Sequence, residues 1–254
     1  MTSAEPHRDQ DRDQGRREQL ATALAAVRER IATACTGAGR APEDVRLVAV
    51  TKTFPATDAA LLTDLGMLDL GENREQEAAP KAAELRELRP DAAVRWHMVG
   101  RLQRNKARSV ARWAAEIQSV DSVRLTHALD RAVAAARAEG ERDGPLRVLL
   151  QASIDGDPDR GGCPLDGLPE LADEVAGSGE LRLRGLMAVA PLGMDAAAAF
   201  GSLARAAERL RRDHPDATEL SAGMTNDLEI AITHGSTCVR VGTALLGTRG
   251  LASP

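Results

Sequence analysis

A chain of 254 residues with 43% hydrophobic residues can bury one sizeable core, and about 250 residues is the typical length of a single α/β barrel. The formal net charge of −5 excludes a chain-wide basic surface for nucleic acid or anionic lipid. Three cysteines without C-x-x-C spacing and five histidines without metal-ligand spacing argue against a disulfide framework and a metal site. We therefore expect no metal, no nucleic-acid partner and a reducing, cytoplasmic location.

The N-terminal stretch carries charges where a signal peptide needs an apolar run, and no segment reaches the roughly 18 apolar residues of a membrane span. We expect a disordered tail over residues 1–16 and one domain over residues 17–254, since no Pro-, Gly- or Ser-rich linker divides the chain. A helix is predicted from Arg17 to about Thr36, on a stripe formed by Leu20, Leu24, Val27 and Ile31.

Beyond this helix, short apolar runs alternate with helical patterns. Strands are predicted at 45–50, 68–70, 95–98, 116–120, 146–151, 183–187, 219–221 and 238–241. Helices are predicted at 57–65, 74–88, 105–114, 122–139, 168–177, 196–213 and 227–234. The strands read as apolar runs without alternation, as expected for parallel strands covered on both faces. The pattern predicts a single (β/α)₈ TIM-type barrel with an extra N-terminal helix, and a doubly wound open sheet is the alternative.

Polar or small residues follow nearly every predicted strand, at the barrel end where active sites are built. Lys52 is the most informative, because it ends the run LVAVTK and so emerges from a buried strand rather than from a solvated helix face. Partial burial there would favour a neutral, nucleophilic amine suited to Schiff-base chemistry. The alternative is a lysine whose ammonium group reaches solvent from the strand end.

Two loops near the C-terminus, SAGMTND at 221–227 and STCVRVGT at 236–243, offer a candidate phosphate site after strands seven and eight. Their glycines let backbone amides approach an anion, and their hydroxyl groups can donate hydrogen bonds. Asp227 and Glu229 would repel a dianion, so ordinary loops are the alternative. The candidate ligands in these loops are Ser221, Gly223, Thr225, Gly242 and Thr243.

Arg240 lies inside the last predicted strand, where a buried charge is costly without a partner. The partner is either a ligand or a carboxylate at the barrel rim such as Glu72. A different basic stretch, GRLQRNKARSVAR at 100–112, lacks interleaved aromatic residues, so we interpret it as a solvated loop and helix face rather than an RNA site.

Together these segments resemble the pyridoxal phosphate homeostasis protein family, also called the YggS/PROSC family, whose barrel is similar to the N-terminal domain of alanine racemase. The resemblance does not cover residues 1 to about 40. The matching segments, in the family's order, are AVTK at 49–52, GEN at 71–73, WHMVGRLQRNK at 96–106, SVDS at 119–122, RLRGLMA at 182–188, SAGMTND at 221–227 and RVGTALLG at 240–247.

The resemblance implies that pyridoxal 5′-phosphate (PLP) is held as a Schiff base on Lys52. It also implies that Asn73 lies near the cofactor ring and that Arg240 faces the pyridine nitrogen. The phosphate would be held by Ser221, Thr225, Gly242 and Thr243. Three departures from the family's pattern are Thr225 in place of serine, Met98 and Val99 in place of Phe and Ile, and Asp159, Arg160, Gly161 and Gly162 in place of a lysine-containing loop. The last departure puts a role for the Asp155–Cys163 loop in doubt.

Two classes of function follow: a protein that stores, delivers or buffers PLP, with apo PLP-dependent enzymes as recipients, or an amino-acid racemase. Racemisation needs a base on each face of the α-carbon, and in alanine racemase the second base is a tyrosine from another domain. This chain has no tyrosine, and a pyridine nitrogen facing Arg240 would make the ring a weak electron sink. We therefore expect the homeostasis role without a dedicated catalytic activity, in a monomer or weak dimer. A barrel that binds another phosphorylated metabolite is a third alternative.

Overall fold

The computed structural model describes residues 5–157 and 161–248, with side chains from residue 13 onward. In this part of the chain, eight parallel strands close into a barrel in the order β1-β2-β3-β4-β5-β7-β8-β9, with β9 paired back to β1. Because β4 also pairs with β5, the sheet has no open edge, which excludes the doubly wound alternative. The barrel strands are β1 Arg46–Val50, β2 Asp69–Glu72, β3 Arg95–Met98, β4 Glu116–Val120, β5 Leu146–Ser153, β7 Leu181–Met187, β8 Glu219–Ser221 and β9 Cys238–Val241.

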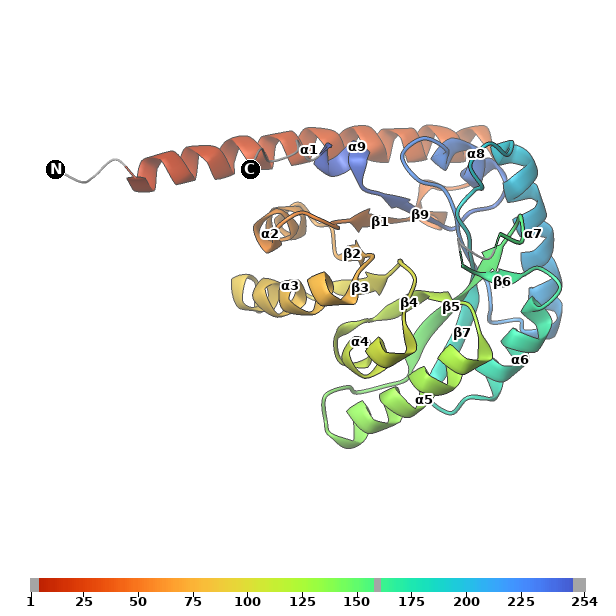
Figure 1. Cartoon of the computed structure of the whole chain (residues 1–254). Coiled ribbons are helices and arrows are strands. Elements are labelled where there is room, and N and C mark those ends of the chain that lie inside the picture. Colours follow the sequence, from red (N-terminus) through yellow and green to blue (C-terminus); the bar gives the residue numbers. More distant parts are fainter. Residues whose placement is uncertain (1–4, 158–160, 249–254) are drawn as a thin grey trace.

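Helices cover the outside of the strands (Figure 1). They are α1 Glu5–Gly37, α2 Ala56–Asp64, α3 Glu75–Leu88, α4 Ala107–Trp113, α5 Val123–Ala138, α6 Leu168–Gly177, α7 Ala196–Asp213, α8 Leu228–Thr233 and α9 Thr243–Leu246. Two 3₁₀ turns, η1 Pro42–Asp44 and η2 Arg104–Lys106, and a short strand β6, Cys163–Pro164, complete the elements. The predicted barrel is thus confirmed, whereas β6 and α9 were not predicted. Asp159 and Arg160, which stand in place of the family's lysine-containing loop, lie outside the described residues.

The N-terminal helix is longer than predicted. It begins at Glu5 rather than Arg17, so residues 5–16, expected to be disordered, continue the helix. Arg16 anchors the end of this segment that adjoins the predicted helix, because its guanidinium pairs with Asp58 at 2.7 Å and donates to the Leu246 carbonyl at 3.1 Å. Residues 5–16 are rich in Asp, Arg and Gln, a composition that favours disorder, although Arg and Gln are good helix formers.

The apolar stripe of α1 is buried as predicted and packs against α8 and α9 (Figure 1). Strand residues that face outward form the hydrophobic layer beneath the helices, whereas many that face into the barrel are polar. The N-terminal helix therefore covers the part of the barrel from which the two candidate phosphate loops emerge. No helix among the described residues is long and apolar enough to cross a membrane.

Candidate cofactor-binding site

Lys52 lies in the turn that follows β1, at the carboxyl end of the barrel. Its side chain is exposed, so the partial burial expected from the sequence is wrong; the strand ends at Val50 and the turn directs the lysine to solvent. Among the described residues it has no hydrogen-bond or ion-pair partner. The next residue, Thr53, has a φ of 67°, which is costly for a β-branched residue. A strained turn therefore presents a free amine at the barrel mouth.

A buried cluster of Thr51, Glu72 and Lys81 anchors the residue at which this turn begins. The Thr51 hydroxyl donates to Glu72 Oε1 at 2.6 Å, and the Lys81 ammonium donates to the same oxygen at 2.5 Å and to the Thr51 carbonyl at 2.8 Å. All three residues are buried, and Glu72 Oε2 has no partner among the described residues. The residue directly before Lys52 is thus held through both its side chain and its backbone.

Arg240 lies inside the barrel on β9 and is only 4% exposed. Its guanidinium donates to Ser221 Oγ at 2.6 Å and to the Ala188 carbonyl at 2.9 Å. It meets no carboxylate among the described residues, and Glu72 is bound to Lys81 instead, so the ion pair considered as an alternative does not form. Burial without such a pair lowers the pKa of Arg240 below its ordinary value. Arg240 is therefore a buried cation with further donors available to a ligand.

The Ser221 hydroxyl connects Arg240 to the interior of the barrel. While it accepts from Arg240, it donates its hydrogen to Gln118 Oε1 at 2.7 Å. Gln118 in turn donates to Glu116 Oε1 at 2.8 Å. The Ser221 hydroxyl is therefore used inside the barrel and has no further hydrogen to donate to a phosphate. Gln118 was missed by the sequence analysis, although a polar residue within the strand EIQSV gave the same signal that singled out Arg240.

The loops after β8 and β9 contact each other, as the predicted phosphate site requires. Thr225 Oγ1 accepts a hydrogen bond from the Ala244 amide at 3.3 Å, which leaves the hydroxyl hydrogen free to donate. A Cβ atom at Gly242 would lie 3.2 Å from the Val50 carbonyl oxygen, tighter than ordinary contact, so a glycine fits there best. Gly242, Thr243 and Thr225 thus come together beside the end of β1.

The two acidic residues that argued against an anion site are both engaged. Glu229 pairs with Arg30 of α1 at 2.7 Å, and Arg30 also donates to the Thr225 carbonyl at 2.8 Å. Asp227 Oδ1 accepts from the Met224 amide at 2.6 Å. The charge of Glu229 is therefore balanced by a cation from the N-terminal helix, which weakens the objection to a phosphate in this position.

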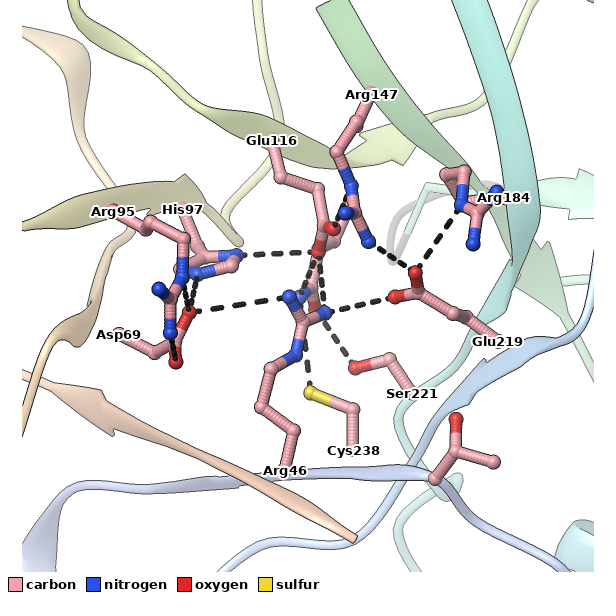
Figure 2. A network of polar contacts seen from close by, with 12 residues as sticks. Arg46, Asp69, Arg95, His97, Glu116, Arg147, Arg184, Glu219, Ser221 and Cys238 are labelled. Atoms are coloured by element: carbon pink, nitrogen blue, oxygen red, sulfur yellow. Dashed lines mark hydrogen bonds and ion pairs between the residues drawn. The ribbon is translucent and has the colours of Figure 1, made fainter. Parts of the chain in front are cut away.

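The opposite, amino-terminal end of the barrel is filled by a charged network (Figure 2). Arg46 donates to Glu116 and Glu219, each at 2.9 Å, and His97 lies between Glu116 at 3.1 Å and Asp69 at 2.8 Å. Burial alone would raise the pKa of Glu116, but His97 and Arg46 lower it to about 2. Burial would likewise lower the pKa of His97, yet its two carboxylate partners raise it. The amino-terminal end therefore stabilises the barrel, and the candidate binding residues lie at the carboxyl end.

A family model described as "Alanine racemase, N-terminal domain" matches residues 22–250, a range that includes every strand of the barrel. The crystal structure of alanine racemase from Corynebacterium glutamicum is 15% identical, with a TM-score of 0.62 over 91% of this chain and 63% of that chain, and so shares the fold alone. The chain is thus of the alanine racemase N-terminal-domain class.

More similar proteins narrow the assignment. The "Pyridoxal phosphate homeostasis protein" of Mycobacterium leprae is 50% identical over 250 residues, 95% of this chain and 97% of that protein. PipY of Synechococcus elongatus, solved with PLP bound, is 36% identical with a TM-score of 0.73, covering 90% of this chain and all of that one. The chain belongs to the pyridoxal phosphate homeostasis protein family.

Proposed function

We propose that this protein binds PLP covalently through Lys52 and serves in intracellular PLP homeostasis, by storing, delivering or buffering the cofactor. The observation that carries the proposal is the placement of an unpartnered amine, Lys52, at the same barrel end as Arg240, a buried cation without a carboxylate. The names of the relatives and the PLP-bound PipY structure support it.

The residues present fit this cofactor. Its phosphate suits the crowded backbone at Gly242 and the free hydroxyl hydrogen of Thr225, with Thr243 alongside. When bound, PLP supplies an aldehyde for attachment and an electron-accepting ring. In this proposal Asn73 lies beside the ring, and Ser221 acts on the cofactor by holding Arg240 in position, since its hydroxyl binds Arg240 and Gln118.

Arg240 makes a dedicated catalytic activity unfavourable. A guanidinium stays protonated, so Arg240 would donate a hydrogen bond to the pyridine nitrogen and keep that nitrogen unprotonated. The chain also has no tyrosine to act as the second base of a racemase. We therefore favour a custodian of the cofactor over a racemase, whose solved representative is similar in fold only.

The proposal extends to partners and location. Apo PLP-dependent enzymes are the recipients we propose, and a monomer or weak dimer leaves the mouth open to them. Three free, buried cysteines, Cys35, Cys163 and Cys238, suit the reducing cytoplasm that we propose.

One experiment tests the binding site. The protein is reconstituted with PLP, its visible absorption band is recorded, borohydride is added, and the reduced adduct is located by peptide mass mapping. We expect the band to bleach and the adduct to lie on Lys52, and Lys52→Ala should take up no covalent adduct. An adduct on Lys81 or Lys106, or none after reconstitution, would contradict the assignment.

A second measurement separates the two classes of function. Incubation with L- or D-alanine should give no racemisation near the turnover of ordinary enzymes, roughly 1 to 10³ per second. Inversion with exchange of the α-proton at such rates would favour the racemase instead.

A further inference from the structure

A large polar groove lies beside the proposed cofactor site. It has a volume of about 1360 Å³ and is bordered by the loops after β2, β3 and β4 and by the first turns of α3 and α5. Asn73 lines one end of it, so the groove opens next to the residue we place beside the cofactor ring. The basic stretch that the sequence analysis set aside forms one wall.

Four arginines in this groove lack partners. Arg101, Arg104, Arg124 and Arg131 are exposed, and none has a hydrogen bond or ion pair with any described residue. Arg124 and Arg131 flank Ala128 at i, i+4 and i+7 spacing, so they project from one face of α5, about 10 Å apart along its axis. The first turn of α5 contains no acidic residue, and Asp121 precedes its N-cap, Ser122.

Two of the three acidic residues of the groove are paired with cations. Glu75 accepts from Ser109 and pairs with Lys106 at 3.4 Å, and Glu77 pairs with Arg74 at 3.3 Å. The third, Asp121, accepts a hydrogen bond from Ser122 and pairs with no cation among the described residues. The six cationic side chains of the lining therefore exceed its three carboxylates by three. In a chain with a net charge of −5, a local surplus of this kind marks a surface for an anionic partner.

The composition of the groove favours a protein over a nucleic acid. None of its described lining residues is aromatic, so it offers no platform on which bases could stack. Its wall also mixes carboxylates and the amides of Gln76, Gln103 and Asn105 with the arginines. A uniformly charged phosphate backbone would meet those carboxylates, whereas a protein segment can present carboxylates to the arginines and donors to the rest.

We propose that this groove docks a carboxylate-rich segment of a partner protein, which Arg101, Arg104, Arg124 and Arg131 recognise. Docking there would hold the partner against the mouth from which the cofactor leaves. The link to cofactor delivery rests on the proposed function; the docking surface itself does not.

The test measures binding of a fluorescein-labelled octaglutamate peptide by fluorescence anisotropy at low salt. We expect Arg101→Glu/Arg124→Glu to weaken binding by at least about tenfold, since two attractive charges become repulsive. Arg86→Glu is the matched control, because Arg86 is an exposed arginine of α3 outside the groove that has no polar partner in the described part of the chain. It should change binding by no more than about twofold. Arg101→Gln/Arg124→Gln gives the milder loss expected of charge removal and serves if the reversal impairs folding.

Two further arms decide what a negative result means. Equal binding by the groove variants and Arg86→Glu would overturn the proposal. An oligothymidylate of eight nucleotides provides the second comparison. If it binds as tightly as the peptide and depends on the same arginines, the groove is a nucleic-acid site and the proposal is overturned. Lys52→Ala should lose the cofactor adduct and still bind the peptide. The groove variants should bind PLP normally, so failure of the docking surface and failure of the cofactor site are separable.

Discussion

Glu116 provides a quantitative test of the charged network at the amino-terminal end of the barrel. Its pKa falls from the ordinary 4.5 to about 2. Because each pH unit between folded and unfolded pKa values is worth about 1.4 kcal/mol, the ionised carboxylate contributes about 3 kcal/mol to the free energy of unfolding. Glu116 is 1% exposed, so solvent screens little of this contribution. We expect Glu116→Gln to lose about this amount at pH 7, as its cationic partners then remain buried without their anion.

The sign of the pH dependence follows from the direction of the change. A carboxylate with a lowered folded pKa stabilises the protein fully above its unfolded pKa of 4.5, and this stabilisation is lost as the pH falls toward 2. The pKa of Asp69 is lowered as well, by His97 and Arg95 against the opposing effect of burial, so the wild-type protein loses further stability in acid. The difference in the free energy of unfolding between wild type and Glu116→Gln should therefore be about 1 kcal/mol smaller at pH 3.5 than at pH 7.

Urea unfolding at pH 7, 5 and 3.5, followed by circular dichroism, measures this gap. Glu84→Gln is the control, because Glu84 is exposed on α3 and has no polar partner among the described residues. Its stability should follow that of the wild type at every pH. A gap for Glu116→Gln that stays constant with pH would refute the reasoning, since the cost would then arise from packing or neutral hydrogen bonds rather than from ionisation.

Substitutions at three further positions, Lys81, Gly100 and Arg240, probe the mouth of the barrel. Lys81→Met leaves Glu72 buried without its cation and should cost about 3–5 kcal/mol in thermal or urea unfolding, most of which Glu72→Gln should restore in the double variant. The Gly100→Ala protein should lose PLP faster in dialysis, because the new Cβ would overlap the backbone of Asn73 and displace it. Unchanged retention of PLP would contradict the placement of Asn73 beside the cofactor ring. Arg240→Lys should weaken cofactor binding, and Arg240→Glu should shift the absorption band of the bound cofactor. Unchanged spectra at full occupancy would contradict the contact between Arg240 and the cofactor ring.

The strands and the barrel were predictable because they depend on local apolar runs and on their number. β3, β4, β8 and β9 begin and end where the sequence placed them. Short elements were missed, since the two residues of β6 and the four of α9 are too few to show a period. The start of α1 was misplaced because residues 5–16 carry no apolar stripe from which a helical period could be predicted.

The candidate site was predictable as a set of residue types and not as a set of contacts. A charge within the strand CVRVG marked Arg240, and the structure does bury it. Its partners could not be read from the sequence, because Ser221 reaches Gln118 across 103 positions of the chain. The exposure of Lys52 depends on where one strand ends and a turn begins, and strand periodicity does not resolve that difference.

The pairing of β1 with β9 joins the first barrel strand to the last, through Arg46–Ala49 and Cys238–Val241. During synthesis, β1 therefore leaves the ribosome long before its neighbour exists. The apolar stripe of α1 is in the same position, because α8 and α9 are translated near the end of the chain. The barrel can close only after translation of β9. For most of its synthesis the nascent protein therefore exposes the unpaired edge of β1 and the apolar face of α1. Such contacts between distant segments form slowly, and an exposed strand edge and apolar helix face favour aggregation during this interval.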